Sequence, residues 1–215
     1  KIREQIREEL GIADKFVIGH VGRFGSMKNH KYMLQILEQC IKIEKKEILP
    51  ETVMMFLGDG ELKEEIRQQA EELGISSRVL FMGNKRDVYR YYQAMDYFLL
   101  PSFYEGLPGT AIEAQASGLP GILSDAVTKE AVVSDLLQLR SIQEEPMLWA
   151  KEIMAVSQRC ALTDNSEQQS EGAGNTGDSQ NEKRGIYADI VKKASFDVKE
   201  QAKKMQEFYL TGKFR

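Results

Sequence analysis

The stretch DYFLLPSFYEGLPGTAIEAQASGLPGILSD, residues 96–125, carries the clearest signal for the fold. Residues 96–101 are an apolar run closed by proline, which predicts a short buried strand. After a loop rich in glycine and proline, residues 109–118 predict a helix, and residues 119–125 predict a second apolar strand. Two apolar strands joined by a helix are typical of a parallel sheet that is covered on both faces.

The same alternation of apolar runs and amphipathic helices extends over most of the chain. A charged helix is expected at the start, over residues 1–12. Further strands are expected at residues 15–22, 52–58, 78–83 and 136–139, and further helices at residues 29–47, 61–74, 87–95 and 145–159. We therefore predict an α/β fold, a Rossmann-like doubly wound parallel sheet of about six strands with right-handed crossovers.

Length and composition divide the chain into three parts. The 215 residues fit one ordinary domain with an appendage, and the apolar fraction of 42% allows a normal core. We expect residues 1–160 to form the Rossmann-like domain, residues 161–184 a disordered polar loop, and residues 185–215 a helical segment. Because the chain begins at Lys1, inside a charged helix, we also expect a fragment of a longer protein.

Charge and hydropathy argue against several classes of protein. The 29 basic and 33 acidic residues are mixed along the chain and give a net charge of −4, which argues against a nucleic-acid partner. No apolar run reaches the roughly 18 residues that span a bilayer, and no signal-peptide pattern is present. Cys40 and Cys160 lie far apart and are expected to be reduced. We expect a cytoplasmic protein, with at most peripheral contact at the inner face of the cell membrane.

Ligands of an open parallel sheet bind beyond the carboxyl ends of its strands. The loops that follow the expected strands are therefore the candidate functional loops. They comprise residues 23–28, 59–61, 83–86, 102–109 and 124–129.

Two cations stand in the first of these loops, where Arg23 and Lys28 flank Gly25. Such a loop suits a diphosphate, because arginine grips two oxygens at once and lysine adds a point charge. Taken alone, a loop that is basic by chance explains these residues equally well. The glycine spacing does not match the dinucleotide fingerprint G-x-G-x-x-G, and no Walker A sequence occurs.

Two glutamates flank the turn after the strand at residues 96–101. Glu113 lies about one turn into the following helix, where a carboxylate can accept hydrogen bonds from a vicinal diol such as a ribose. Glu105, in the loop, can bind sugar hydroxyls or stabilise positive charge at an anomeric carbon. Gly106 and Gly109 permit close backbone approach to an anion at the helix start. Taken singly, Glu105 is more simply a solvated loop residue and Glu113 a helix-dipole partner.

Other chemical signatures are absent. The sequence has no Asp-x-Asp pair, no metal-binding His/Cys spacing and no G-x-S-x-G, so we predict neither a metal nor another cofactor. His20 is expected in the core, and His30 is expected to cap a helix or lie on the surface. The aromatic side chains expected to serve packing are Tyr89, Tyr91, Tyr92 and Trp149.

Several segments together resemble a known family. The segments GRFGSMK (22–28), FLGDGEL (56–62), VLFMGNKRDV (79–88), MDYFLLPSFYEGLPGTAIEAQASGLP (95–120) and SDAVTKE (124–130) occur in this order. Their order and spacing resemble the C-terminal, donor-binding domain of a GT-B glycosyltransferase of family 4, of the bacterial exopolysaccharide and capsule type. The last helix resembles the terminal helix with which that family returns to its N-terminal domain.

The resemblance implies a function and a set of site residues. It implies retaining, metal-independent transfer of a hexose from a nucleotide-diphosphate sugar, with UDP expected, to a glycan or lipid-linked acceptor in polysaccharide biosynthesis. The acceptor would be held mainly by a missing N-terminal domain. The implied catalytic residues are Glu105, Arg23 and Lys28, and the implied donor-binding residues are Gly22, Gly83, Asn84, Lys85, Gly106, Leu107, Gly109, Thr110 and Glu113.

Two residues depart from the family pattern. Pro108 stands where many relatives have glycine, and Asn29 stands where a glycine often follows the lysine. Both leave the motif intact and are candidates for setting the choice of donor. Two other functions stay open. One is a non-catalytic nucleotide-sugar-binding module, in which Glu105 would be idle. The other is a nicotinamide oxidoreductase, which the glycine spacing disfavours.

Overall fold

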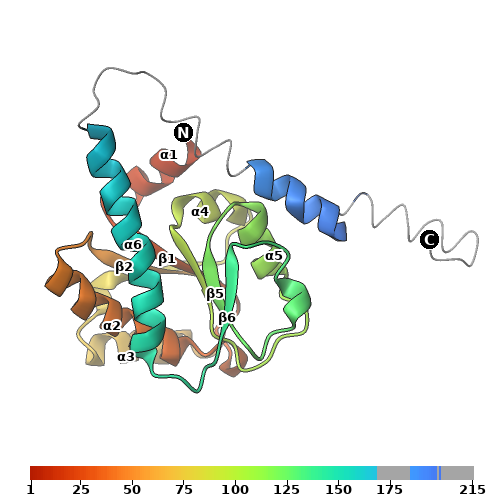
Figure 1. Cartoon of the computed structure of the whole chain (residues 1–215). Helices are drawn as coiled ribbons and strands as arrows, with labels where there is room; N and C mark the ends of the chain where they lie inside the picture. Colours follow the sequence, from red (N-terminus) through yellow and green to blue (C-terminus); the bar gives the residue numbers. More distant parts are fainter. Residues whose placement is uncertain (169–184, 198, 200–215) are drawn as a thin grey trace, which may run out of the picture.

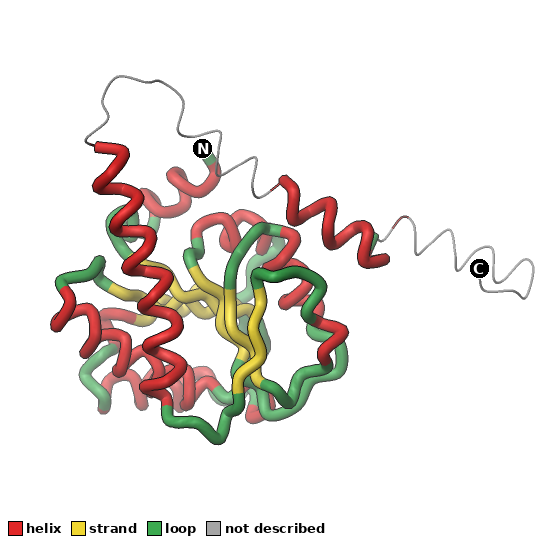
Figure 2. Tube along the Cα trace, in the orientation of Figure 1, coloured by secondary structure: helices red, strands yellow, loops and turns green. Residues whose placement is uncertain are grey.

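The computed structural model describes residues 1–168, 185–197 and 199, and it contains one sheet of six parallel strands (Figures 1 and 2). The strands are β1 (Phe16–Val21), β2 (Thr52–Leu57), β3 (Val79–Gly83), β4 (Tyr97–Leu100), β5 (Gly121–Ser124) and β6 (Leu137–Arg140). Their order across the sheet is β3-β2-β1-β4-β5-β6. The predicted Rossmann-like parallel sheet is confirmed.

The strand order reverses at the centre of the sheet, between β1 and β4. β1 pairs with β2 along its whole length, from Phe16 opposite Thr52 to Val21 opposite Leu57. On its other side β1 pairs with β4, where Gly19 lies opposite Phe98. At such a reversal the loops leaving the two central strands run to opposite sides and leave room for a ligand.

Helices cover both faces of the sheet (Figure 1). The helices α2 (His30–Glu47), α3 (Lys63–Glu72) and α6 (Pro146–Gln168) pack on one face. The helices α4 (Val88–Ala94) and α5 (Gly109–Ala116) pack on the other, and α1 (Ile2–Glu9) contacts α4. Short 3₁₀ turns lie at Ser26–Lys28 (η1), Ser76–Arg78 (η2) and Lys129–Ala131 (η3).

The central strands are apolar on both faces because both faces are covered. Every residue of β2 is buried, and its side chains alternate between two core clusters, Met54 in one and Val53 in the other. Burying one such side chain completely contributes about 1.5–3 kcal/mol. The continuous apolar runs that predicted the strands are therefore also the main source of stability of the sheet.

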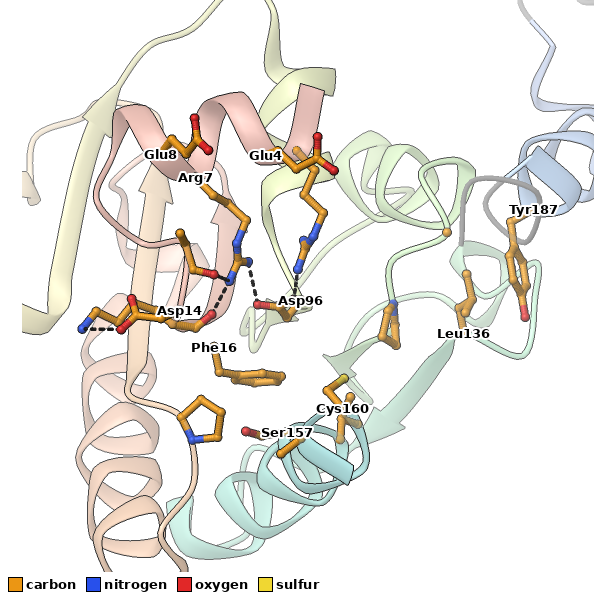
Figure 3. A pocket seen from close by; sticks show the side chains of 18 residues that line it. Glu4, Arg7, Glu8, Asp14, Phe16, Asp96, Leu136, Ser157, Cys160 and Tyr187 are labelled. Carbon is orange, nitrogen blue, oxygen red and sulfur yellow. Dashed lines mark hydrogen bonds and ion pairs between the residues drawn. The ribbon is translucent and has the colours of Figure 1, made fainter. Parts of the chain in front are cut away.

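Helix α1 is joined to the start of β4 by a charged network centred on Asp96. Arg7 Nη1 donates to Asp96 Oδ2 at 2.9 Å, and Arg3 Nη2 donates to Asp96 Oδ1 at 2.5 Å. Figure 3 shows this network in the wall of a cavity of about 610 Å³, with Phe16 and Leu136 also in its lining. The cavity lies at the amino-terminal edge of the sheet, opposite the expected ligand edge, and its arginines are already paired.

Helix α6 extends further than the sequence predicted. Residues 161–168 were expected in the polar loop, but the backbone is helical through Gln168. No glycine or proline occurs before Gly172, so no residue in this stretch interrupts the addition of helical hydrogen bonds. The remainder of the expected loop, residues 169–184, lies outside the described residues.

The expected C-terminal helical segment is described only in part. Residues 185–191 are helical, and a π-helical turn, Lys192–Phe196, follows. Residues 198 and 200–215 lie outside the described part of the chain. Among the helices that are described, none is both long and apolar enough to cross a bilayer.

Candidate functional site

The loops after β1 and β4 meet through an ion pair between Lys28 and Glu105. Lys28 ends the 3₁₀ turn η1, and its Nζ contacts Oε1 of Glu105. The two side chains are only 19% and 16% exposed. Ser102 Oγ donates a second hydrogen bond to the same carboxylate oxygen, at 2.9 Å. The structure therefore brings two of the three predicted catalytic residues into direct contact at the reversal of strand order.

Backbone contacts hold these loops in place. The N–H of Phe103 donates to the carbonyl of Met27 at 2.9 Å, which ties the loop after β4 to the loop after β1. On the other side, Glu105 forms a parallel bridge with Val127, in the loop after β5. Ser124 Oγ donates to the carbonyl of Ser102 at 2.6 Å. Contacts among the loops that follow β1, β4 and β5 thus determine where the Glu105 carboxylate lies.

Arg23, the third predicted catalytic residue, has a different partner. Its guanidinium donates to Oε2 of Glu61, with Nη2 at 2.9 Å and Nε at 3.2 Å. Both side chains are exposed, Arg23 by 76%. The N–H of Glu61 and the Arg23 guanidinium lower the pKa of the Glu61 carboxyl. Solvent screens an exposed pair of this kind and leaves it weak, so a phosphate can readily replace Glu61 as the partner of Arg23.

Glycines let the loops after β1 and β2 touch each other. A Cβ on Gly58, whose φ is +135°, would lie 2.0 Å from the carbonyl oxygen of Gly22. A Cβ on Gly22 would lie 2.8 Å from Nε2 of His20 and 3.1 Å from Cε of Lys28. Gly22, predicted as a donor-binding residue, is thus also required by the packing around Lys28.

A second cavity, of about 370 Å³, opens at the carboxyl ends of β1, β2 and β3. It brings together four residues that the sequence predicted for the site. Gly83, also predicted, lies beside it with φ +66° and accepts a hydrogen bond from the N–H of Gly58 at 2.9 Å. The residues that line the cavity are Val21, Gly22, Arg23, Leu57, Gly58, Asp59, Asn84, Lys85 and Val88.

Glu113 is exposed on helix α5 and is held by a buried tyrosine. The hydroxyl of Tyr92, on α4, donates to Glu113 Oε2 at 2.9 Å and lies 3.2 Å from the carbonyl oxygen of Thr110. The sequence assigned Tyr92 to packing, and its ring is indeed buried. The contact with Glu113 was missed, because it depends on how α4 and α5 pack together, which no residue pattern reveals.

The turn before α5 is open. Gly106 and Leu107 are exposed, and a Cβ on Gly106 or Gly109 would meet no described residue within 4 Å. The hydroxyl of Thr110 is buried and has no hydrogen-bond partner among the described residues. These four residues, all predicted for donor binding, thus surround the start of the helix without filling the space beside it.

The two departures from the family pattern have physical explanations. Asn29 adopts the left-handed conformation, φ 57° and ψ 45°, which glycine adopts freely and asparagine tolerates best among the other residues. Pro108 is the N-cap of α5, and its carbonyl accepts from the N–H of Ala111 at 3.0 Å. An N-cap N–H lies outside the helical ladder, so proline removes no helix hydrogen bond there.

Two buried histidines lie next to Lys28. His20 Nδ1 donates to the carbonyl of Leu99 at 2.9 Å, as expected for a core histidine. The prediction for His30 was wrong, because its ring is 2% exposed and stacks on Phe24 at a centroid distance of 4.2 Å. Burial, and then the charge of Lys28, lowers the pKa of His30 to about 4. Burial, with His30 adding to it, also lowers the pKa of His20. The pair thus forms a neutral neighbour for the lysine.

Comparisons with known proteins agree with this arrangement. The family model of the glycosyl transferases group 1 matches residues 2–158. EpsF of Bacillus subtilis is 38% identical over 146 residues, 66% of this chain and 36% of EpsF. The UDP-Gal:alpha-D-GlcNAc-diphosphoundecaprenol alpha-1,3-galactosyltransferase of Escherichia coli is 33% identical over 113 residues, 52% of this chain and 28% of that protein.

Among solved structures, Anabaena HepE in complex with UDP and glucose has a TM-score of 0.72 at 22% identity. The likeness covers 98% of this chain and 52% of HepE, and it shows a shared fold. The chain matches only about a third of the length of the curated relatives. The family match itself covers the whole sheet and both central loops. This chain belongs to the glycosyl transferases group 1 family.

Proposed function

We propose that this chain is the donor-binding part of a retaining glycosyltransferase. It would bind a nucleotide-diphosphate sugar, with UDP as the nucleotide, for transfer of a hexose to a glycan or lipid-linked acceptor in polysaccharide biosynthesis. The observation that carries the proposal is the ion pair between Lys28 and Glu105, which joins a cation for phosphate and a carboxylate for sugar at the reversal of strand order.

Each part of such a donor has a matching feature in the site. The cavity beside Asn84 and Lys85 suits the nucleobase, and the exposed Glu113 carboxylate suits the ribose hydroxyls. The diphosphate would lie between the two cations and the first turn of α5, whose unpaired N–H groups attract anions. The hexose would then lie at Glu105.

The chemistry assigned to these residues follows from their charge. In the transfer, the bond between the anomeric carbon and the phosphate oxygen breaks, and the diphosphate leaves with the electron pair. Arg23 and Lys28 stabilise the negative charge on the leaving diphosphate. In this proposal the two side chains take the part that a divalent cation plays in other transferases. Glu105 stabilises the positive charge at the anomeric carbon. The acceptor hydroxyl oxygen then bonds to that carbon on the face that the diphosphate left, and its proton passes to the departing phosphate oxygen.

The relatives support the choice of nucleotide and acceptor. The name of the Escherichia coli relative gives a UDP-sugar as donor and a diphosphoundecaprenol-linked sugar as acceptor. HepE was solved with UDP-glucose. A lipid-linked acceptor agrees with the expected place of action in the cytoplasm, at the inner face of the cell membrane. The acceptor site belongs, in this proposal, to a part of the protein beyond these residues.

Thermal unfolding with a panel of ligands tests the donor site. A ligand at 100 times its dissociation constant should add about 2.7 kcal/mol to the stability of the chain. We expect this shift with UDP and UDP-glucose, and a smaller one with GDP and ADP. A chain whose stability is unchanged by all four ligands has no donor site of this kind.

Transfer kinetics of the variant E105Q test whether the site is catalytic. Loss of the carboxylate should lower kcat by about 10²–10³, the effect of removing one group that stabilises charge in a transition state. A non-catalytic nucleotide-sugar-binding module has no turnover to lose. Unchanged kcat in E105Q contradicts the role given to Glu105.

A further inference from the structure

We propose that Tyr92 is a positioning residue, which orients the Glu113 carboxylate for the two hydroxyls of a ribose and so makes the site prefer ribonucleotides. The inference rests on the proposed function, because it concerns the ribose part of the same donor site. It starts from the hydrogen bond of 2.9 Å between the Tyr92 hydroxyl and Glu113 Oε2.

Packing fixes the position of the tyrosine hydroxyl. The side chain of Tyr92 is 1% exposed and belongs to the core cluster beneath α4 and α5. Its ring lies 6.2 Å from the ring of Phe98, on the central strand β4. Because the ring cannot move without disturbing the core, the hydroxyl is a fixed donor just beneath the exposed Glu113.

The hydroxyl also stays protonated. Burial, and then the adjacent Glu113 carboxylate, raises the pKa of Tyr92. Its single proton has two acceptors within reach, Glu113 Oε2 at 2.9 Å and the carbonyl oxygen of Thr110 at 3.2 Å. The nearer and charged acceptor forms the stronger bond.

This bond leaves one carboxylate oxygen for a ligand. Within the described part of the chain, Oε1 of Glu113 receives no hydrogen bond, and the residue is exposed. The side chain projects from α5 toward α4, whose first residue, Val88, lines the cavity assigned to the nucleobase. The orphan hydroxyl of Thr110 lies one turn earlier on α5. The free oxygen is thus available beside the place where a ribose would lie.

Orientation of the carboxylate has an energetic consequence. An exposed glutamate samples several rotamers, and fixing such a side chain on binding costs conformational entropy. Tyr92 fixes one oxygen before the ligand arrives, so a ribose diol meets a carboxylate that is already oriented. A ligand without these hydroxyls gains nothing from that orientation. The effect of Tyr92 on binding should therefore depend on the ribose hydroxyls.

Titration calorimetry with UDP and 2′,3′-dideoxy-UDP separates this role from a structural one. The full wild-type chain should bind UDP at least about tenfold more tightly than the dideoxy compound, as expected for hydrogen bonds to a charged group. The variant Y92F should lower that preference about threefold or more, and only through weaker binding of UDP. The matched control Y97F removes another buried tyrosine hydroxyl, at the start of β4, and should bind both ligands like the wild type.

The variants distinguish failure of this inference from failure of the proposed function. If E113Q loses the preference for UDP and Y92F keeps it, Tyr92 has no positioning role, but the ribose site stands. Equal weakening of both ligands in Y92F also overturns the inference, because it shows a structural effect. A wild-type chain without any preference overturns the ribose site itself. If Y92F unfolds, two other replacements of Tyr92 test the inference. 4-Aminophenylalanine keeps the ring and a hydrogen-bond donor and should keep the preference for UDP, whereas 4-methylphenylalanine has no donor and should lower it. Equal preferences in these two variants contradict the inference.

Discussion

Lys28 and Glu105 are separated by 77 positions in the sequence, yet they form an ion pair across the reversal of strand order between β1 and β4. The pair is partly shielded from solvent, and Ser102 adds a hydrogen bond to the carboxylate. This relationship joins the two loops that hold the predicted catalytic residues. The same two side chains therefore stabilise the loops and carry out the proposed chemistry.

The first prediction concerns the free energy of this pair. In K28M or E105Q, one partly buried charge loses its partner, so each variant should be less stable than the wild type. In the double variant neither charge remains unpaired. Urea unfolding of the four proteins should give a coupling free energy of about 1–2 kcal/mol. Additive effects of the two substitutions contradict a stabilising pair.

The second prediction concerns the pair between Arg23 and Glu61. The variant E61Q should free the guanidinium and tighten the binding of UDP about two- to fivefold, since the weak exposed pair no longer has to break when UDP binds. The gain should shrink as salt is added, because salt screens exposed charges. The matched control E64Q removes a carboxylate that pairs with Arg67 instead. Equal effects of E61Q and E64Q on the affinity for UDP contradict this prediction. They show that the change in net charge alone tightens binding, and that Glu61 does not compete with UDP for Arg23.

The third prediction concerns stability in acid. The pKa of His30 falls from 6.5 in the unfolded chain to about 4 in the folded protein. Between these values the unfolded chain binds the extra proton, so the free energy of unfolding falls as the pH falls from 6.5 toward 4. The slope from one such histidine is at most about 1.4 kcal/mol per pH unit.

The variant H30L tests this slope. Urea unfolding at several pH values should show a less steep loss of stability for H30L than for the wild type between pH 6.5 and 4. The carboxylates titrate in both proteins and cancel in the comparison. Parallel curves contradict the view that His30 is buried in its neutral form.

The fourth prediction concerns the left-handed backbone at Asn29. The variant N29G should be as stable as the wild type, because glycine adopts this conformation freely. The variant N29A should lose about 1 kcal/mol, the cost of a Cβ in the left-handed region. Urea unfolding measures both effects. An N29A chain as stable as N29G contradicts the left-handed conformation of residue 29.

Much of the fold was predictable from local signals. The apolar runs of β1, β2 and β4 are continuous because both faces of the sheet are covered, and the alternation with helices predicts parallel strands. Lys28 and Glu105 could be assigned to one edge of the sheet because each follows such a strand. Helix α6 was underestimated, because polar residues permit a helix without predicting one.

The partners of the site residues were not predictable. Glu61 and Tyr92 contact Arg23 and Glu113 through side chains from different elements, so their pairing depends on the packing of those elements. The burial of His30 follows from the stacking of Phe24 on its ring, which a single position in a helix does not reveal. Sequence patterns thus placed residues at an edge, and the packing determined their contacts.

The most direct test of the account is the affinity of the chain for UDP, measured by titration calorimetry for the wild type, K28M and K31M. Lys31 pairs with Glu65, and its side chain is 56% exposed, so K31M is a control for the loss of one positive charge. The account predicts saturable binding to the wild type, binding at least about tenfold weaker in K28M, and no change in K31M. UDP binding that does not saturate, or that K28M retains in full, contradicts it.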